Sequence, residues 1–275
     1  MNPQDIAAFR SRIFKFYDRN RRVFPWRQTV DRYAVMVSEI MLQQTQAERV
    51  VPKFEAWLQR FPDPECLATA PLRDVLLFWS GLGYNSRAQR LQRCAALIME
   101  RHGGSVPSTP EELKTLPGIG EYTCRSIPVF ADNLDVAAVD TNIRRILIHE
   151  FALPEDISAT GLRAVAEELL PTGRSREWHN ALMDYGALEL TSRRTAIRPL
   201  TKQSTFKGSK RWYRGRLIRE LIATEGMFLE EIEARYDSSR WSIREIIDDL
   251  VREGLVERGE KEGSGASAIL RIKGS

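Results

Sequence analysis

The chain has 275 residues, of which 43% are hydrophobic and 28% charged, a balance typical of a folded globular protein. This composition argues against a disordered or collagen-like chain, and a run of about 18 apolar residues, as a membrane span requires, is absent. The N-terminus is charged throughout and has no apolar core of signal-peptide length, so a cytoplasmic protein is expected, associated with the nucleoid if the host is a prokaryote. The three cysteines and three histidines show no metal-ligand spacing, and we predict neither a metal site nor a disulfide framework.

The positive charge is concentrated in one stretch. The net charge is +4, but residues 190–219 contain ten Lys or Arg and no Asp or Glu. A stretch of one sign is typical of a solvated linker or of a surface that follows a phosphate backbone. Both interpretations remain open from charge alone.

Apolar side chains recur at helical spacing through the first 200 residues, which predicts an all-α fold. Glycine and proline clusters separate the periodic segments. The expected helices cover residues 6–17, 33–44, 50–61, 71–78, 86–102, 110–116, 122–131 and 143–151.

A new pattern follows a basic, polar connector at residues 191–209. Helices are expected at 211–223, 228–236 and 239–252, the last capped by Ser238 or Ser239, and then two short strands at 255–258 and 268–273. Three helices followed by a hairpin is the order of a winged helix, which binds DNA in some proteins and packs or dimerises in others. We therefore predict a helical domain of two lobes (1–190), a connector (191–209) and a small α+β winged helix (210–275).

The segment Leu116-Pro117-Gly118-Ile119-Gly120 lies between two predicted helices. Two glycines around one aliphatic residue allow a tight turn with outward-facing amides, and the next helix begins at once. Such amides suit a backbone phosphate, although an ordinary helix–helix turn has the same pattern.

Two acids, Glu39 and Asp140, stand in otherwise apolar surroundings. Glu39 interrupts an apolar helix, where desolvation would raise its pKa and suit it to act as an acid. Asp140 follows a small apolar run, a position also typical of a helix N-cap. Paired carboxyls suit glycosidic cleavage, since one protonates the leaving group and the other stabilises an oxocarbenium-like sugar.

These motifs resemble those of the helix-hairpin-helix DNA glycosylases, in the branch of MutY-type adenine glycosylases. The resemblance covers about residues 5–200. It rests on FPWR (24–27), SEIMLQQTQ (38–46), WSGLGYNSRA (79–88), HGGSVP (102–107), LPGIGEYT (116–123) and AVDTNIRRI (138–146), in the order of the family.

The resemblance implies that Glu39 protonates the extruded base and that Asp140 stabilises the cationic sugar. It also implies that the hairpin amides bind a phosphate, often beside a monovalent cation, and that a group of side chains fills or probes the gap in the duplex. The residues expected to contact DNA are Gln43, Gln44, Tyr84, Leu116, Gly118, Gly120, Tyr122, Thr123, Asn142 and Arg144. Bifunctional relatives such as endonuclease III carry a nucleophilic lysine two residues after the second glycine, where this chain has Tyr122, so a monofunctional enzyme is expected.

The sequence departs from the family in two places. Four iron–sulfur cysteines spaced C-x6-C-x2-C-x5-C would fall on Leu190, Ile197, Leu200 and Phe206, so we expect a member without a [4Fe-4S] cluster, in which these side chains form a small apolar cluster instead. Residues 210–275 also do not resemble the Nudix-like domain with which MutY-type enzymes recognise 8-oxoguanine.

The expected partner is double-stranded DNA with a mismatched or damaged base pair, bound by a monomer that acts in base excision repair. Adenine opposite 8-oxoguanine or guanine is the favoured target. Thymine or uracil opposite guanine is an alternative, because the hairpin sequence GEYTC is close to the GKYTC of thymine mismatch glycosylases. A DNA-binding protein that kept the fold but lost the chemistry is the second alternative, and the presence of both Glu39 and Asp140 argues against it.

Overall fold

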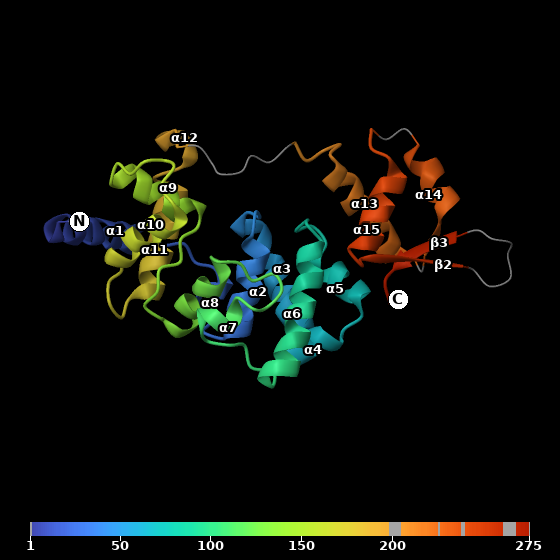
Figure 1. Cartoon of the computed structure of the whole chain (residues 1–275), viewed down its shortest axis with the longest axis horizontal. Helices are drawn as coiled ribbons and strands as arrows, with labels where there is room; N and C mark the ends of the chain where they lie inside the picture. Colours follow the sequence, from blue (N-terminus) through green and yellow to red (C-terminus); the bar gives the residue numbers. More distant parts are fainter. Residues whose placement is uncertain (1, 198–204, 225, 238–239, 261–267, 275) are drawn as a thin grey trace. The chain divides into compact units, whose positions relative to one another are not determined.

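The computed structural model describes residues 2–197, 205–224, 226–237, 240–260 and 268–274 (Figure 1). The chain forms two compact units, which are described separately: residues 1–40 with 106–202, and residues 41–105 with 203–275. The division falls inside a helix, after Ile40. Residues 41–105 thus group with the C-terminal segment rather than with the rest of the predicted helical domain.

The first unit consists of helices packed around α11 (Ser175–Leu188), which contacts α1, α8 and α9. Trp178 of α11 is buried, and its ring lies 5.8 Å from that of Phe9 and 5.5 Å from that of Phe14. The remaining elements are α1 (Pro3–Asn20), the 3-10 helix η1 (Pro25–Arg27), α2 (Arg32–Leu42) up to Ile40, α7 (Pro110–Leu113), α8 (Thr123–Asp132), α9 (Thr141–Glu150), α10 (Ala159–Glu168) and α12 (Ser192–Thr195).

The second unit begins with a helical part around the buried rings of Trp57 and Trp79, whose centroids are 5.5 Å apart. Its helices are α3 (Ala47–Arg60), α4 (Pro64–Thr69), α5 (Leu72–Trp79) and α6 (Ser86–His102). The α4 helix was not expected from the sequence. It is short, and Asp63 caps it by accepting a hydrogen bond from the Cys66 amide at 2.8 Å.

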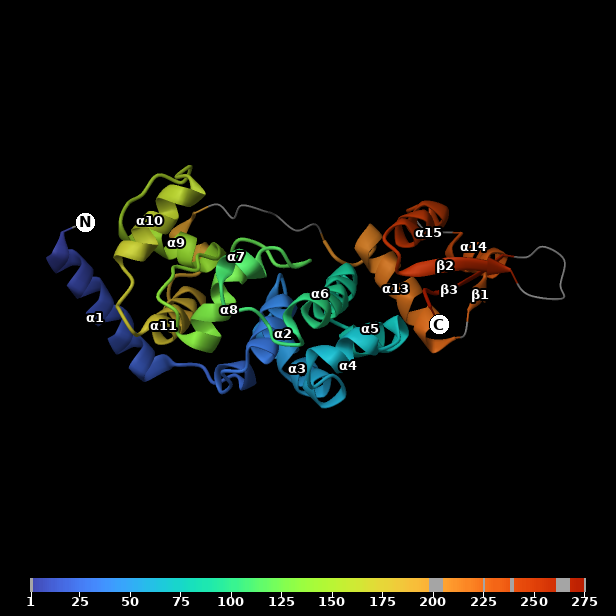
Figure 2. The ribbon, with the colours of Figure 1, turned by 60° about the horizontal axis from the view of Figure 1, so that its bottom comes forward.

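The C-terminal part of this unit is a winged helix, as the sequence predicts (Figures 1 and 2). It contains α13 (Lys210–Ala223), β1 (Met227–Phe228), α14 (Leu229–Tyr236), α15 (Ile243–Arg252), β2 (Val256–Glu260) and β3 (Ala268–Ile272). The sheet is antiparallel in the order β1-β3-β2, and Arg258 of β2 pairs with Leu270 of β3.

Two details of this part correct the sequence-based expectation. The sheet has three strands, because Met227 and Phe228 pair with Leu270 and Ile269, and a strand of two residues has no detectable alternation. The third helix begins at Ile243, capped by Ser242, whose hydroxyl accepts a hydrogen bond from the Glu245 amide at 3.3 Å. The caps first expected, Ser238 and Ser239, lie outside the described residues.

The winged helix is bonded to the helical part of its own unit. The Arg73 guanidinium of α5 donates to the carbonyl of Ile222 at 2.7 Å, and the Gln89 amide of α6 donates to the carbonyl of Gly254 at 2.6 Å. Gly254 has φ of +74°, a conformation that favours glycine. Over the described residues, no helix has the length and apolar character needed to cross a membrane.

Candidate active site

Glu39 is buried in α2, with 7% of its surface exposed, in the first unit. The hydroxyls of Ser126 and Tyr122 lie close to its carboxyl group and lower its pKa by favouring the charged form. Tyr122 comes directly before α8 and Ser126 lies one turn further on in that helix, so the two hydroxyls reach the carboxyl from the same side of the hairpin helix. Tyr122 was expected to contact DNA, whereas Ser126 was not foreseen, because a small polar residue within a helix has no distinctive sequence signal.

Burial has a strong effect on the acidity of Glu39. Desolvation, and to a smaller extent the charge of Asp140, raise the pKa of Glu39 from 4.5 to about 7, against the lowering effect of the two hydroxyls and of Arg27. Burial, and to a smaller extent the nearby carboxyls of Glu39 and Asp140, raise the pKa of Tyr122 well above its ordinary value, so the phenol keeps its proton. Glu39 is therefore an acid that holds and releases a proton near neutral pH.

Asp140 is the N-cap of α9, and its charge also acts on the buried carboxyl group of Glu39. One carboxylate oxygen accepts from the Ile143 amide at 2.7 Å and the other from the Asn142 side chain at 2.9 Å. Burial raises its pKa, and the two amides and Arg145 counteract this by stabilising the charged form. The capping interpretation and the catalytic one are compatible, because the cap holds the carboxylate in one orientation.

The orientation of Asp140 is secured through its neighbours. The Asn142 amide oxygen accepts from the Arg145 guanidinium at 2.9 Å, and Arg145 also donates to the carbonyls of Gly186 and Leu190 at 2.8 and 2.6 Å. A side chain at Gly186 would approach Asn142 to 3.2 Å, so glycine permits α11 to pass close to α9. Asn142 was expected to contact DNA, and the structure places it beside Asp140.

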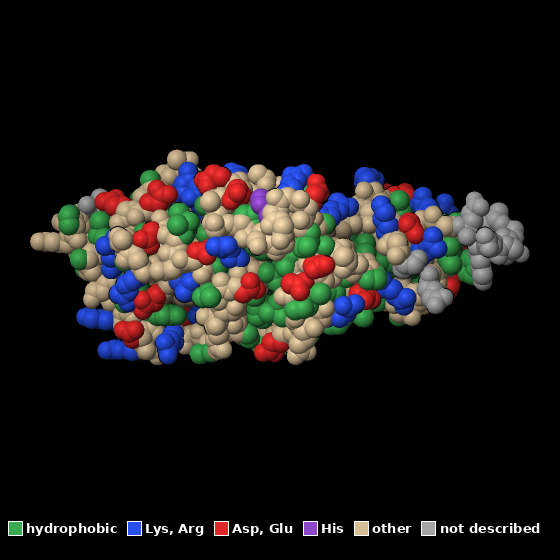
Figure 3. Space-filling view, turned by 90° about the horizontal axis from the view of Figure 1, so that it is seen from below, with side chains coloured by type: hydrophobic (Ala, Val, Ile, Leu, Met, Phe, Trp, Pro, Cys, Tyr) green, Lys and Arg blue, Asp and Glu red, His purple; other side chains and the backbone are tan. Residues whose placement is uncertain are grey.

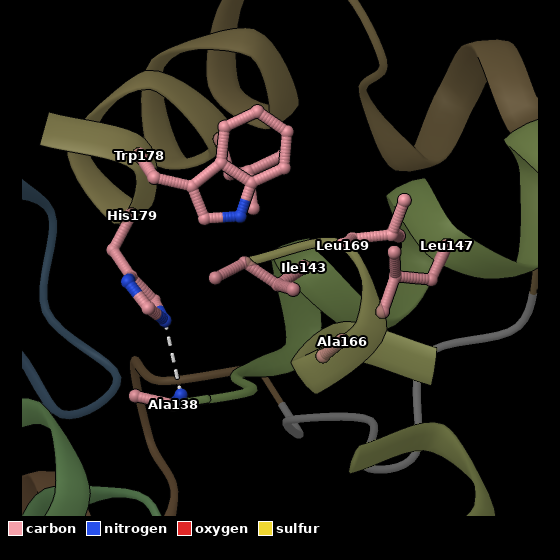
Figure 4. A pocket seen from close by; sticks show the side chains of 8 residues that line it. Ala138, Ile143, Leu147, Ala166, Leu169, Trp178 and His179 are labelled. Atoms are coloured by element: carbon pink, nitrogen blue, oxygen red, sulfur yellow. Dashed lines mark hydrogen bonds between the residues drawn. The ribbon is translucent and has the colours of Figure 1, made fainter. Parts of the chain in front are cut away.

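The loop leading to Asp140 is held by a buried histidine. His179 accepts a hydrogen bond from the Ala138 amide at Nε2 (3.0 Å) and donates from Nδ1 to the Ser175 carbonyl (2.8 Å), as Figure 4 shows for the first of these bonds. Burial lowers its pKa to about 4, so the ring is neutral and keeps this tautomer. The small hollow in Figure 4, which is lined by Ile143 and Trp178, is largely apolar and has no charged side chain that could bind or activate a substrate.

The hairpin has the turn that the sequence predicts. Gly118 has φ of +87°, and the Ile119 amide donates to the Leu116 carbonyl at 3.2 Å. Within the described residues, the amides of Gly118 and Gly120 donate to no protein acceptor. These amides and the N-terminus of α8 form a group of donors suited to an anion.

Three cations gather beside the hairpin on one carboxylate. Glu121 accepts from Lys114 at 2.6 Å, from Arg163 at 2.9 Å and from Arg125 at 3.2 Å. Lys114 and Arg125 lower the pKa of Glu121. Arg163 also lies 3.9 Å from the carboxylate of Glu167, so two acids face three cations and the balance next to the free amides is positive. Sequence reasoning missed this cluster, since Arg163 comes from α10, 42 residues away from Glu121.

The residues expected to probe the duplex lie in the second unit, and one arginine braces both loops that carry them. Arg87 is 7% exposed and donates to the carbonyl of Gln43 at 2.7 Å and to that of Gly83 at 3.1 Å. Gln44 and Tyr84 each have a positive φ, of 56° and 49°, a strained conformation for residues with a side chain. Such strain is typical of functional loops held by their surroundings.

Three of the expected contacts are less accessible. Leu116, Thr123 and Arg144 have exposed fractions of 3%, 3% and 9%. The Arg144 guanidinium donates to the Glu155 carbonyl within the protein. DNA contacts by Leu116 and Thr123 would have to involve the backbone, and the expected contact by Arg144 has no support in this geometry.

Several of the described cations in the basic segment form ion pairs with carboxylates of the winged helix. Lys210 pairs with Asp249 at 2.6 Å, Arg214 with Glu253 at 2.5 Å and Arg216 with Glu220 at 3.0 Å. Figure 3 likewise shows positive and negative side chains interspersed on the face that it displays. In the part of the segment that the structure describes, these three cations are therefore partly neutralised and do not form one continuous phosphate-binding surface.

The residues present do not fit an iron–sulfur cluster. The expected ligand positions carry no cysteine, and the described residues contain no group of three or more His, Cys, Asp or Glu that could hold a metal. In the first unit, Leu190 belongs to the hydrophobic core around Trp178 and Ile197 is also buried, whereas Phe206 of the second unit is 55% exposed. Leu200 lies outside the described residues.

Comparison with known proteins identifies the family. Residues 37–172 match the model of the HhH-GPD superfamily of base excision DNA repair proteins. The adenine DNA glycosylase of Mycolicibacterium smegmatis is 34% identical over 90% of this chain and 92% of its own length. That of Mus musculus is 38% identical over 78% of this chain, but the chain spans only 44% of the mouse protein.

Solved structures agree on the fold. A thermostable thymine-DNA glycosylase is 29% identical, with a TM-score of 0.65, over 69% of this chain and 89% of that one. An endonuclease III–DNA complex has a TM-score of 0.62 at 18% identity, over 73% and 91% of the two chains. The chain therefore belongs to the HhH-GPD superfamily of base excision DNA repair proteins. Within that superfamily its relatives place it in the MutY-type branch, which confirms the resemblance seen in the sequence.

Proposed function

We propose that this protein is a monofunctional DNA glycosylase of base excision repair, which extrudes an adenine from a mismatched pair and hydrolyses its N-glycosidic bond. The observation that carries the proposal is Glu39, a buried carboxyl whose pKa of about 7 makes it an effective acid at neutral pH. The names of the relatives, which are adenine DNA glycosylases, support adenine as the base.

The reaction follows from the roles of the two carboxyls. Glu39 donates its proton to the extruded base, and the bond between C1′ and the base nitrogen breaks with its electron pair on the base. The Asp140 carboxylate, held by the Ile143 amide and Asn142, stabilises the oxocarbenium-like sugar. Water then attacks C1′ and gives up a proton to the Glu39 carboxylate, which leaves an abasic site and restores the acid. No Schiff base forms at the hairpin, because Tyr122 has no amine.

Duplex DNA would bind through its backbone at the hairpin. The free amides of Gly118 and Gly120 are suited to one phosphate, and Lys114 and Arg163 supply positive charge nearby. The proposal also includes a monovalent cation at the hairpin, the absence of an iron–sulfur cluster, and a monomeric protein. A broad absorbance near 400 nm in the purified protein would contradict the second of these.

Thymine opposite guanine is the second candidate. The similarity to a thymine-DNA glycosylase at 29% identity favours it, together with the hairpin sequence at 120–124. The opposite-base specificity of the MutY-type relatives does not transfer directly, because residues 210–275 form a winged helix here.

One experiment tests the function. Single-turnover base release would be measured on duplexes with A opposite 8-oxoguanine, A opposite G, T opposite G and U opposite G, with and without alkali. We expect adenine release that requires alkali for strand scission, and loss of release with retained duplex binding in Glu39→Gln and Asp140→Asn. Release of thymine or uracil alone would assign the second candidate, and no release from any duplex would refute the proposed function.

A further inference from the structure

Three nitrogen-bearing side chains from two separate segments of the second unit converge on Gly254, in the turn after α15. A Cβ atom at this glycine would lie 3.4 Å from Gln89 Nε2, 3.5 Å from Arg93 Nη2 and 3.9 Å from Lys273 Nζ. Gln89 and Arg93 face the same way because they are one turn apart in α6, and Lys273 directly follows β3. The helical part and the winged helix thus contribute to one donor group, which consists of Gln89, Arg93 and Lys273.

The two cations of the donor group are exposed, and no carboxylate neutralises them. Among the described residues, the side chains of Arg93 and Lys273 form no ion pair and no hydrogen bond. The adjacent acid in the chain, Glu253, is instead paired with Arg214 at 2.5 Å. Because two like charges lie within 4 Å of one point with no acid bonded to either, the local potential is positive.

Gln89 gives the donor group a fixed part. Its side chain is 7% exposed, and its amide nitrogen donates to the Gly254 carbonyl at 2.6 Å. That nitrogen carries a second hydrogen, which this bond does not use. Gly254 is favoured by its backbone conformation, and its lack of a side chain also leaves the space between the three nitrogens open. The donors therefore border an open space on a rigid frame.

The donor group lies along α6 from the turn that is expected to probe the duplex. Tyr84 of that turn lies two residues before α6, and the helix axis rises about 10 Å from Ser86 to Arg93. Arg90 lies between them, is exposed and likewise has no carboxylate partner in the part of the chain that the structure describes. The winged helix lies beside the same turn, since the Arg211 guanidinium is 5.1 Å from the centroid of the Tyr84 ring. Unpaired positive charge therefore runs from the probing turn toward the donor group.

The third helix of the winged helix offers no comparable group. Its two arginines are paired, Arg244 with Glu233 at 2.6 Å and Arg252 with Asp249 at 3.0 Å. The ten residues of α15 contain these two arginines against three acids, so the helix carries a net charge of −1. A helix that enters the major groove of DNA meets a negative backbone, and α15 lacks the positive charge for this.

The oxygen atoms of a backbone phosphate match the chemistry of the donor group. An amide, a guanidinium and an ammonium group all donate hydrogen bonds, and the two charged donors make the stronger bonds to an anionic oxygen. Phosphates follow one another every 3.4 Å or about that along the axis of a DNA strand, so about 10 Å of α6 spans about three base pairs. A line of cations of this length suits a polyanion better than a single small anion such as inorganic phosphate.

We propose that the donor group of Gln89, Arg93 and Lys273 binds one backbone phosphate of duplex DNA, about three base pairs from the extruded nucleotide, and that Arg90 lies on the path to it. This inference rests on the proposed function, because it takes Tyr84 to lie at the gap in the duplex. It gives the winged helix a defined contact with DNA, which lies at the end of β3 rather than on α15.

Methylphosphonate scanning tests this contact, because each such linkage removes the charge of one phosphate. Fluorescence anisotropy would give the affinity of the full-length protein for duplexes with a tetrahydrofuran abasic-site analogue and one methylphosphonate, placed at successive positions on either side of it in both strands. The variants are Arg93→Gln, Lys273→Gln and the double variant. The matched control is Arg101→Gln, which removes one charge from an exposed position at the far end of α6.

In the wild type, a methylphosphonate about three base pairs from the abasic site should lower the affinity by at least about three-fold. The double variant should bind the unmodified duplex about ten-fold more weakly, reduce the slope of log affinity against log salt by about 2, and show no further loss with that methylphosphonate. Arg101→Gln should keep the wild-type response. The proposal is overturned if the wild type has no such position, or if the double variant keeps the methylphosphonate response or the wild-type salt slope. Because the analogue has no base to release, a lack of base release in the earlier experiment would refute the proposed function without deciding this result.

Discussion

The raised pKa of Glu39 predicts that the free energy of unfolding depends on pH. A carboxyl whose pKa is raised from 4.5 in the unfolded chain to about 7 in the folded one binds more protons when folded. The folded state is therefore destabilised as the pH rises through this range, by about 3 kcal/mol once Glu39 is ionised. Between pH 5 and 8 the loss amounts to about 2.5 kcal/mol.

The substitution Glu39→Gln removes this penalty, because glutamine resembles the protonated acid and cannot ionise. We expect the variant to have no base release and to exceed the wild type in free energy of unfolding by an amount that grows by about 2.5 kcal/mol from pH 5 to 8. Urea unfolding at several pH values measures the difference. Glu55→Gln, at an exposed position of α3, is the control and should show no such trend. A difference between Glu39→Gln and wild type that does not vary with pH would refute the desolvation argument.

Three further predictions concern the groups around the site. Tyr122→Phe removes a hydroxyl that lowers the pKa of Glu39, so the midpoint of the pH profile for single-turnover base release should move upward from about 7, and a downward move would contradict this arrangement. Arg87→Met removes the guanidinium bonds to the carbonyls of Gln43 and Gly83, which then keep only the Thr45 hydroxyl and the Trp79 indole as donors. The variant should lose about 2 kcal/mol in urea unfolding and should reduce the affinity for an abasic-site duplex more than for an intact one. Equal losses for both duplexes would show that Arg87 does not position the probing loops. Asp184→Asn breaks a buried carboxylate bonded to two arginines and should cost about 3–5 kcal/mol at pH 7. Because the arginines lower the pKa of Asp184, this contribution is present at neutral pH and is lost only as the pH falls through the folded-state value, so equal stabilities of variant and wild type at pH 7 would contradict the assigned role.

Features encoded by neighbouring residues were predictable from the sequence. The α6 helix has the bounds that its apolar periodicity predicts, and the turn of Gly118 follows from the glycine spacing. The two candidate catalytic carboxyls were found because an acid in an apolar segment stands out. The family was likewise predictable, since its motifs are short and contiguous.

The surroundings of those carboxyls depended on tertiary structure. The hydroxyl of Ser126 reaches Glu39 from a helix 87 positions further along the chain, and its polar character alone does not indicate a partner. Long-range neighbours are selected by packing of whole helices, which a local pattern does not specify. The same holds for Arg163 beside the hairpin and for His179 below the loop of Asp140.

The C-terminal segment shows most clearly which features follow from the sequence and which depend on the tertiary structure. Its sequence by itself determined three helices and a hairpin, because apolar spacing and turn residues are local signals. Only the tertiary structure decided how its charges are used: Lys210 and Arg214 pair within the winged helix, and Arg211 packs on Tyr84. The physical reason is that a charge acts on whatever the fold brings within a few ångströms, and the order of residues does not reveal that distance.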